Sequence, residues 1–199
     1  MPAETNEPVA AKAASPQPWA NPQVRVAAVV ILIILVALGL YFGGVFKSSK
    51  HHKKHAVSAI GPVVQTAAAL KNQALSTGPF YWAGRIPGDS YEFTRDTSGS
   101  LFVRYVPQGS SPRVKCKCLI VVTYPFPGGY YALKKQAHTA GIPIIHGKSG
   151  SIILRDPKHR KSIYIGFKSN PQVQVVVYAP RPAIAASIAT SGQVQPVTG

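Results

Sequence analysis

The sequence predicts an α+β fold: a mostly antiparallel sheet of about seven strands with two helices on one face, preceded by one transmembrane helix. Three observations lead to this prediction. A long apolar run without charges occupies residues 26–46. Short aromatic and β-branched runs, separated by Gly and Pro turns, fill residues 79 to 178. The predicted elements come in the order strands, helix, strands, helix, which is typical of α+β domains.

The first 46 residues predict a tail and a membrane span. Residues 1–24 are rich in Ala, Pro and polar residues without an apolar period, so we expect a disordered N-terminal tail. The 21 residues of the apolar run would reach about 31 Å as a helix, which matches the hydrocarbon thickness of a bilayer. A cleaved signal peptide is disfavoured because the run follows a polar tail and lacks a small-residue exit site. We therefore predict a transmembrane helix at residues 25–46.

A basic cluster follows the apolar run directly. We interpret its lysines as a membrane-surface charge collar, each contributing about 1 kcal/mol of attraction to anionic headgroups when close to them. A metal site at the interspersed histidines is disfavoured, because neighbouring lysines repel a cation and no acidic or cysteine ligand is near. The collar consists of Lys47, Lys50, Lys53 and Lys54, and the histidines are His51, His52 and His55.

Residues 47–78 are predicted to be a basic juxtamembrane segment and a spacer that contains a short helix. Gly61 and Pro62 interrupt the segment, and the helix-forming residues after them favour a helix. The folded domain is expected at residues 79–197, beginning at Pro79.

Three strands are predicted at 80–86, 90–96 and 100–106, with turns at "PGD" and "TSGS" between them. In the second strand Tyr91 and Phe93 fall on one face and Glu92 and Thr94 on the other. Segment 118–124 is apolar throughout, which predicts a central strand covered on both sides.

The remaining elements alternate between helix and strand signals. A helix is expected at 128–141, where Gly141 is a suitable C-terminal stop. Strands are expected at 150–156, 162–168 and 172–178. Pro180 and Pro182 then open an Ala-rich helix that Gly192 closes, and the chain ends in a polar tail.

Three stretches carry a family resemblance. The sequences "YWAGRIPGDSYEFTRDTSGSLFVRYVP", "VVTYP" and "VVVYAPRPAIAASIATSGQVQPV" resemble uncharacterised actinobacterial single-pass membrane proteins. The resemblance covers about residues 79–197. It implies an anchored extramembrane domain and carries over no catalytic residues. Relative to that family, this chain has a longer N-terminal tail and the added Lys/His cluster.

The side of the membrane on which the domain lies stays open. The lysine collar places the domain in the cytoplasm by the positive-inside rule. Small anchored bacterial domains often face outward, and the resemblance implies the same. Cys116 and Cys118 are the only cysteines. In an extended strand their α carbons would be about 6.6 Å apart and poorly aimed for a bridge. We therefore expect reduced strand thiols and no metal site, which favours the cytoplasm slightly.

No reaction signature is present, so we expect no enzymatic activity and no cofactor. Glu92 is the one carboxylate inside a predicted strand, and we interpret it as a cross-strand ion pair with Arg95 or Arg104. The alternative makes Glu92 a general acid. The spacing of His138, His146 and His159 does not match a metal-binding motif. The segment "GKSG" at 147–150 lacks the remaining residues of a phosphate-binding loop. No G-x-S-x-G motif of a hydrolase is present.

Charge suggests an anionic neighbour. The chain has 22 Lys and Arg against 6 Asp and Glu, a net charge of +16, which fits lipid headgroups, an envelope polymer or nucleic acid. The clearest candidate polyanion contact is one turn with Arg155, Lys158, Arg160 and Lys161. Aromatic residues for base stacking exist at Tyr124, Phe126, Tyr130 and Tyr131, but no nucleic-acid-binding motif is present, so specific nucleic-acid binding is disfavoured.

The sequence thus predicts a single-pass membrane-anchored protein whose basic C-terminal domain acts as a binding or interaction module at the membrane surface. Two alternatives remain: a cell-envelope enzyme with a site near Glu92, and an anionic-polymer or nucleic-acid binding domain.

Overall fold

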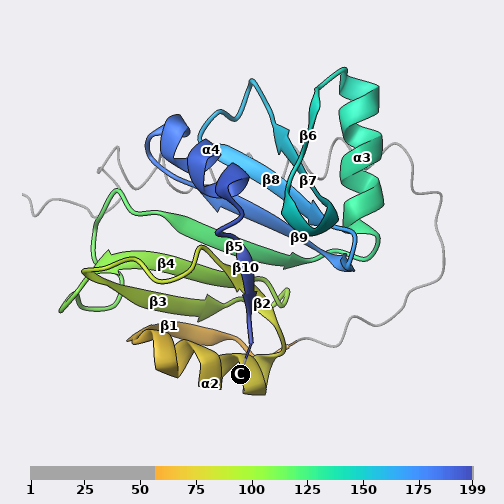
Figure 1. The fold of residues 1–199 in the computed structure, drawn as a ribbon. Helices are drawn as coiled ribbons and strands as arrows, with labels where there is room; N and C mark the ends of the chain where they lie inside the picture. The colour runs from red at the N-terminus through yellow and green to blue at the C-terminus, as the bar shows by residue number, and fades with distance from the viewer. Residues whose placement is uncertain (1–56, 199) are drawn as a thin grey trace, which may run out of the picture. The chain divides into compact units, whose positions relative to one another are not determined.

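An eight-stranded sheet organises the part of the chain that the computed structural model describes, residues 57–198 (Figure 1). The strand order is β1-β3-β4-β5-β9-β8-β7-β6, and all neighbours are antiparallel. The strands are β1 (Ile60–Gln65), β3 (Asp89–Arg95), β4 (Leu101–Pro107), β5 (Ile120–Pro125), β6 (Ile144–His146), β7 (Ser151–Arg155), β8 (Ser162–Phe167) and β9 (Asn170–Tyr178). The prediction of an α+β fold with a mostly antiparallel sheet is confirmed.

A small second sheet and three helices complete the described part. The second sheet pairs β2 (Phe80–Trp82) with β10 (Gln195–Val197) in antiparallel fashion. The helices are α2 (Ala67–Thr77), α3 (Gly129–Ala140) and α4 (Pro182–Ser191), with one 3-10 turn at Lys148–Gly150. The predicted polar tail after Gly192 was wrong in part, because it contains β10.

The predicted transmembrane helix at 25–46, the disordered tail and the lysine collar lie outside the described residues. Within residues 57–198 no helix has both the length and the apolar character needed to cross a membrane.

The helices lie on both faces of the sheet, so their prediction on one face was wrong. Because alternate residues of a strand point to opposite faces, neighbouring positions of β7 belong to different cores. Ile153 packs in the main core with α2, α4 and the second sheet. Ile152 and Leu154 pack with Leu133 and Ala137 of α3. A sheet buried on both faces explains the continuous apolar runs in β5, β7 and β8.

Strand β1 and helix α2 belong to the folded unit, so the expected start at Pro79 was too late. β1 pairs with β3 at the edge of the sheet, with a register shift between Ile60 and Val63. A proline is tolerated in an edge strand because no neighbour needs its missing N–H. In α2, Thr66 caps the N-terminus, accepting a hydrogen bond from the N–H of Ala69 at 3.3 Å.

The two C-terminal helix stops are confirmed. Gly141 after α3 and Gly192 after α4 have φ values of 64° and 82°, a conformation that glycine adopts without a Cβ penalty. A third glycine allows α3 to pack close to β8. A Cβ at Gly166 would lie 3.1 Å from Tyr130 Cα.

Candidate functional site

An ion pair is buried where β3 and β4 lie side by side. Glu92 and Arg104 are directly opposite each other in the register, and Arg104 Nη1 donates to Glu92 Oε1 at 2.8 Å. The Glu92 side chain is 6% exposed and that of Arg104 is 19% exposed. The predicted cross-strand pair is confirmed with Arg104 as partner. Arg95 instead donates from Nε to the carbonyl of Ser58 at 2.9 Å.

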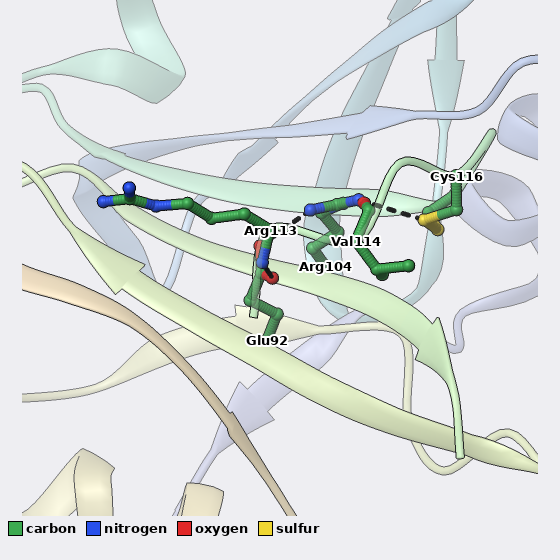
Figure 2. The surroundings of a disulfide bond; sticks show 6 residues. Glu92, Arg104, Arg113, Val114 and Cys116 are labelled. Carbon is green, nitrogen blue, oxygen red and sulfur yellow. Dashed lines mark hydrogen bonds and ion pairs between the residues drawn. A yellow bond between two sulfur atoms is a disulfide. The ribbon is translucent and has the colours of Figure 1, made fainter. Parts of the chain in front are cut away.

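A loop between β4 and β5 covers this pair (Figure 2). The backbone N–H of Arg113 donates to Glu92 Oε2, and Arg104 Nη2 donates to the carbonyl of Val114. Arg104 Nη2 also lies 3.1 Å from Cys116 Sγ. One guanidinium therefore connects a buried carboxylate, the backbone of the loop and a sulfur atom. Both carboxylate oxygens of Glu92 have a donor.

Cys116 and Cys118 form a disulfide, so the prediction of reduced thiols was wrong. The prediction assumed that both cysteines lie in an extended strand, but β5 begins only at Ile120. In the loop before it the chain is more compact, and the two α carbons are 5.2 Å apart. This separation lies in the usual range for a disulfide. Cys116 is partly exposed, whereas Cys118 is buried at 9% exposure.

The predicted basic turn connects β7 and β8. Arg155, Lys158, Arg160 and Lys161 are all exposed. The carboxylate of Asp156 accepts from the ring of His159 at 2.8 Å and from the N–H of Lys158 at 2.8 Å. Burial alone would raise the pKa of Asp156, but these hydrogen bonds and charges outweigh burial and lower it. The one acidic residue of the turn is thus held ionised by its own neighbours. Burial, with the nearby Asp156 charge, raises the pKa of the adjacent Tyr164 to about 12.

The sheet topology brings further basic residues to this turn. The start of β5, the end of β9 and the start of β8 are neighbours, because Ile120 pairs with Tyr178 and Tyr178 with Ser162. At about 4.8 Å between strands, the ends of β5, β9, β8 and β7 span roughly 15 Å. We call the exposed cations at and next to these strand ends the basic end of the sheet: Lys115, Lys117, Arg155, Lys158, Arg160, Lys161 and Arg181.

The aromatic residues considered for stacking do not join the basic end. Tyr124 lies near the end of β5 and Phe126 follows that strand. Tyr130 and Tyr131 lie in the first turn of α3. The basic end is at the start of β5, so the fold places these aromatic side chains at the opposite end of the strand.

The histidines named from the sequence are likewise not gathered. His138 and His146 are exposed, and His159 is bound to Asp156. Residues 57–198 contain no group of three or more His, Cys, Asp or Glu side chains that could hold a metal. The "GKSG" segment forms the 3-10 turn between β6 and β7.

A hollow of about 350 Å³ lies at the other end of β8. Tyr81 stacks on Phe167 there at 4.3 Å between ring centroids, and Lys148, Ser151 and Val194 contribute to the lining. Glu92 does not line this hollow, so it is not the pocket that an acid catalyst at Glu92 would need.

No protein-family model, curated protein or solved structure matches this chain. The resemblance to actinobacterial single-pass membrane proteins therefore stays a prediction.

Sequence reasoning found an ion pair of Glu92 with Arg95 or Arg104 and the basic turn, but missed the disulfide and the basic end as a unit. The ion pair could be predicted from the sequence because one short turn joins its two strands. The convergence of Lys115 and Lys117 with residues 155–161 depends on β9 lying between β5 and β8. No local sequence signal carries that order.

Proposed function

We propose that this chain is a single-pass membrane-anchored binding protein, and that the basic end of its sheet binds an anionic polymer of the cell envelope. The observation that carries the proposal is the convergence of seven exposed cations, from the end of β7 and three connecting segments, on adjacent strand ends. A surface of one charge sign attracts a polyanion and gains affinity by releasing its counterions.

The acidic residues support this choice of ligand. Residues 57–198 hold 16 Lys and Arg against 4 Asp and Glu. Glu92 is buried against Arg104, and Asp156 is bound to His159. The charge of Glu92 is paired with Arg104, and the charge of Asp156 offsets only part of the positive charge of the turn, so the basic end keeps an excess of positive charge.

The disulfide supports an extracytoplasmic position for the domain. Disulfides persist in oxidising compartments and are rare in the cytosol. The lysine collar argues for the opposite side, but long segments and whole domains are translocated largely regardless of charge. We therefore give more weight to the Cys116–Cys118 bond than to the collar.

The enzyme alternative is less well supported by the geometry. A general acid must reach the substrate with its proton, whereas Glu92 is 5% exposed and both its oxygens accept hydrogen bonds within the protein. This arrangement fits a structural ion pair.

We expect polymer binding to depend on where the charge lies. The full chain in detergent is applied to immobilised inorganic polyphosphate and eluted with salt. The triple variant Lys158→Gln, Arg160→Gln and Lys161→Gln should elute at clearly lower salt. The logarithm of the binding constant decreases linearly with the logarithm of the salt concentration. The magnitude of this slope should be smaller by about one for each substituted residue that binds a phosphate in the unchanged chain.

The matched control removes three exposed lysines away from the basic end: Lys134→Gln, Lys135→Gln and Lys168→Gln. It should elute close to the unchanged chain. Equal shifts for both triple variants would mean bulk charge only and would overturn the proposed surface. Competition by free glycerol phosphate at the same phosphate concentration would point to single headgroups and contradict a polymer ligand.

We also expect the C-terminus to lie outside the cytoplasm. A reporter active only in the periplasm or cell exterior, fused after Gly199, should be active, and a reporter active only in the cytoplasm should be silent. The reverse pattern would show that the lysine collar decides the orientation, and it would exclude an envelope polymer as the ligand.

A further inference from the structure

We propose that Cys116 and Cys118 form a thiol–disulfide exchange site, in which Cys116 reacts with a dithiol-containing partner and Arg104 stabilises its thiolate. This activity goes beyond polymer binding and does not depend on it. It also goes beyond the expectation from sequence, because the arginine and the sulfur meet only in the folded loop.

The two cysteine residues differ in exposure. Cys116 is partly exposed, and its neighbours Lys115 and Lys117 are exposed as well. Cys118 is buried at 9% exposure. Exchange proceeds by in-line attack of a thiolate on one sulfur of a disulfide, so access decides which sulfur is attacked. Cys116 is the more exposed of the two residues, so we place the attack on its sulfur.

The guanidinium of Arg104 is placed to stabilise the Cys116 thiolate, which the second step releases. Its Nη2 lies 3.1 Å from Cys116 Sγ, an interaction that becomes charge-assisted once the sulfur carries a negative charge. Glu92 holds Nη1 at 2.8 Å and keeps the fork fixed on the sulfur (Figure 2). A cation beside a cysteine favours the thiolate, which is the nucleophile and leaving group of exchange.

The reaction balances in two steps. A substrate thiolate attacks Cys116 Sγ, the Cys116–Cys118 bond breaks, and Cys118 leaves as a thiolate that takes up a proton. The second substrate thiolate then attacks the substrate sulfur of the mixed disulfide and displaces the Cys116 thiolate. Two electrons pass from the substrate dithiol to the cysteine pair, and a second disulfide-bearing partner reoxidises the pair by the same steps in reverse.

The first measurement tests the thiolate. In the full chain carrying Cys118→Ser, reduced and held in detergent, the rate of Cys116 alkylation by iodoacetamide is followed against pH. The midpoint should lie well below the value of about 8.5 for an ordinary thiol. Arg104→Gln should raise the midpoint by about one pH unit, and at a pH well below both midpoints it should therefore lower the alkylation rate by about tenfold.

Two further variants separate this role from a merely structural one. Glu92→Gln removes the competing negative charge but keeps an acceptor for Arg104, so the midpoint should move lower still. Lys168→Gln removes one exposed cation away from the basic end and should change the rate less than twofold. If Arg104→Gln fails to fold, the midpoint of the Cys118→Ser chain and the exchange measurement below still decide the proposal.

The second measurement tests exchange itself. The unchanged chain, at about one hundredth of the substrate concentration, should accelerate the reaction of dithiothreitol with oxidised glutathione, and Cys116→Ser should abolish the acceleration. A midpoint near the ordinary thiol value that does not respond to Arg104→Gln, or no acceleration by the unchanged chain, would overturn the proposal and leave the disulfide as a structural link.

Discussion

Replacing Arg104 with alanine should lower the free energy of unfolding by about 3 kcal/mol, because it leaves a buried carboxylate without its partner. The Glu92 side chain is 6% exposed, so water cannot replace the lost donor. The loop carbonyl of Val114 loses its donor at the same time. Urea unfolding of the full chain in detergent, followed by the fluorescence of the buried Trp82, measures the loss.

Two comparisons make this result specific. Arg95→Ala removes an arginine from the neighbouring strand whose one side-chain bond in the described part is to the Ser58 carbonyl, and it should cost less than about 1 kcal/mol. The double variant Glu92→Leu and Arg104→Leu should recover most of the stability, since replacing both partners of a buried pair by apolar residues is often close to neutral. If Arg104→Ala lowers the free energy of unfolding by less than about 1 kcal/mol, Glu92 becomes solvated or protonated at little cost once the Arg104 side chain is removed. That result would contradict the prediction.

Leu70→Ala should lower the free energy of unfolding by about 3 kcal/mol, since burial of a leucine that is fully enclosed contributes about 2 to 5 kcal/mol. Leu70 is 0% exposed and packs in the main core with Ala74 and Phe80. The prediction tests whether α2 is part of the fold or a spacer. The same urea titration provides the measurement.

The chain supplies its own control for this prediction. Leu75 lies on the same helix but is 75% exposed, so Leu75→Ala should change stability by no more than about 0.5 kcal/mol. Equal, small effects of both variants would show that the domain is stable without α2 and would restore the start at Pro79. For the same reason, polymer-binding experiments on a fragment that begins at residue 79 would lack an edge strand and part of the core.

Much of the fold could be predicted because its signals are local. The β3–β4 hairpin is joined by a short turn, and its alternation places Tyr91 and Phe93 in the core. Helices α3 and α4 end at glycines that the sequence shows directly. An ion pair of Glu92 within this hairpin was predicted, and the observed register selects Arg104 over Arg95 as its partner. Each of these features depends on residues within about a dozen positions of one another.

The sequence by itself determined the order of most strands and helices, the helix stops, the excess of positive charge and an ion pair of Glu92 with either Arg95 or Arg104. The tertiary structure decided the rest. β1 forms an edge strand because β3 offers it an open edge. The helices cover both faces because β5, β7 and β8 are apolar on both. Cys116 reaches Cys118 and Arg104 because the chain before β5 leaves the extended conformation. The basic end exists because strands distant in sequence pair side by side, and such pairing depends on packing across the whole sheet, which no short stretch of sequence encodes.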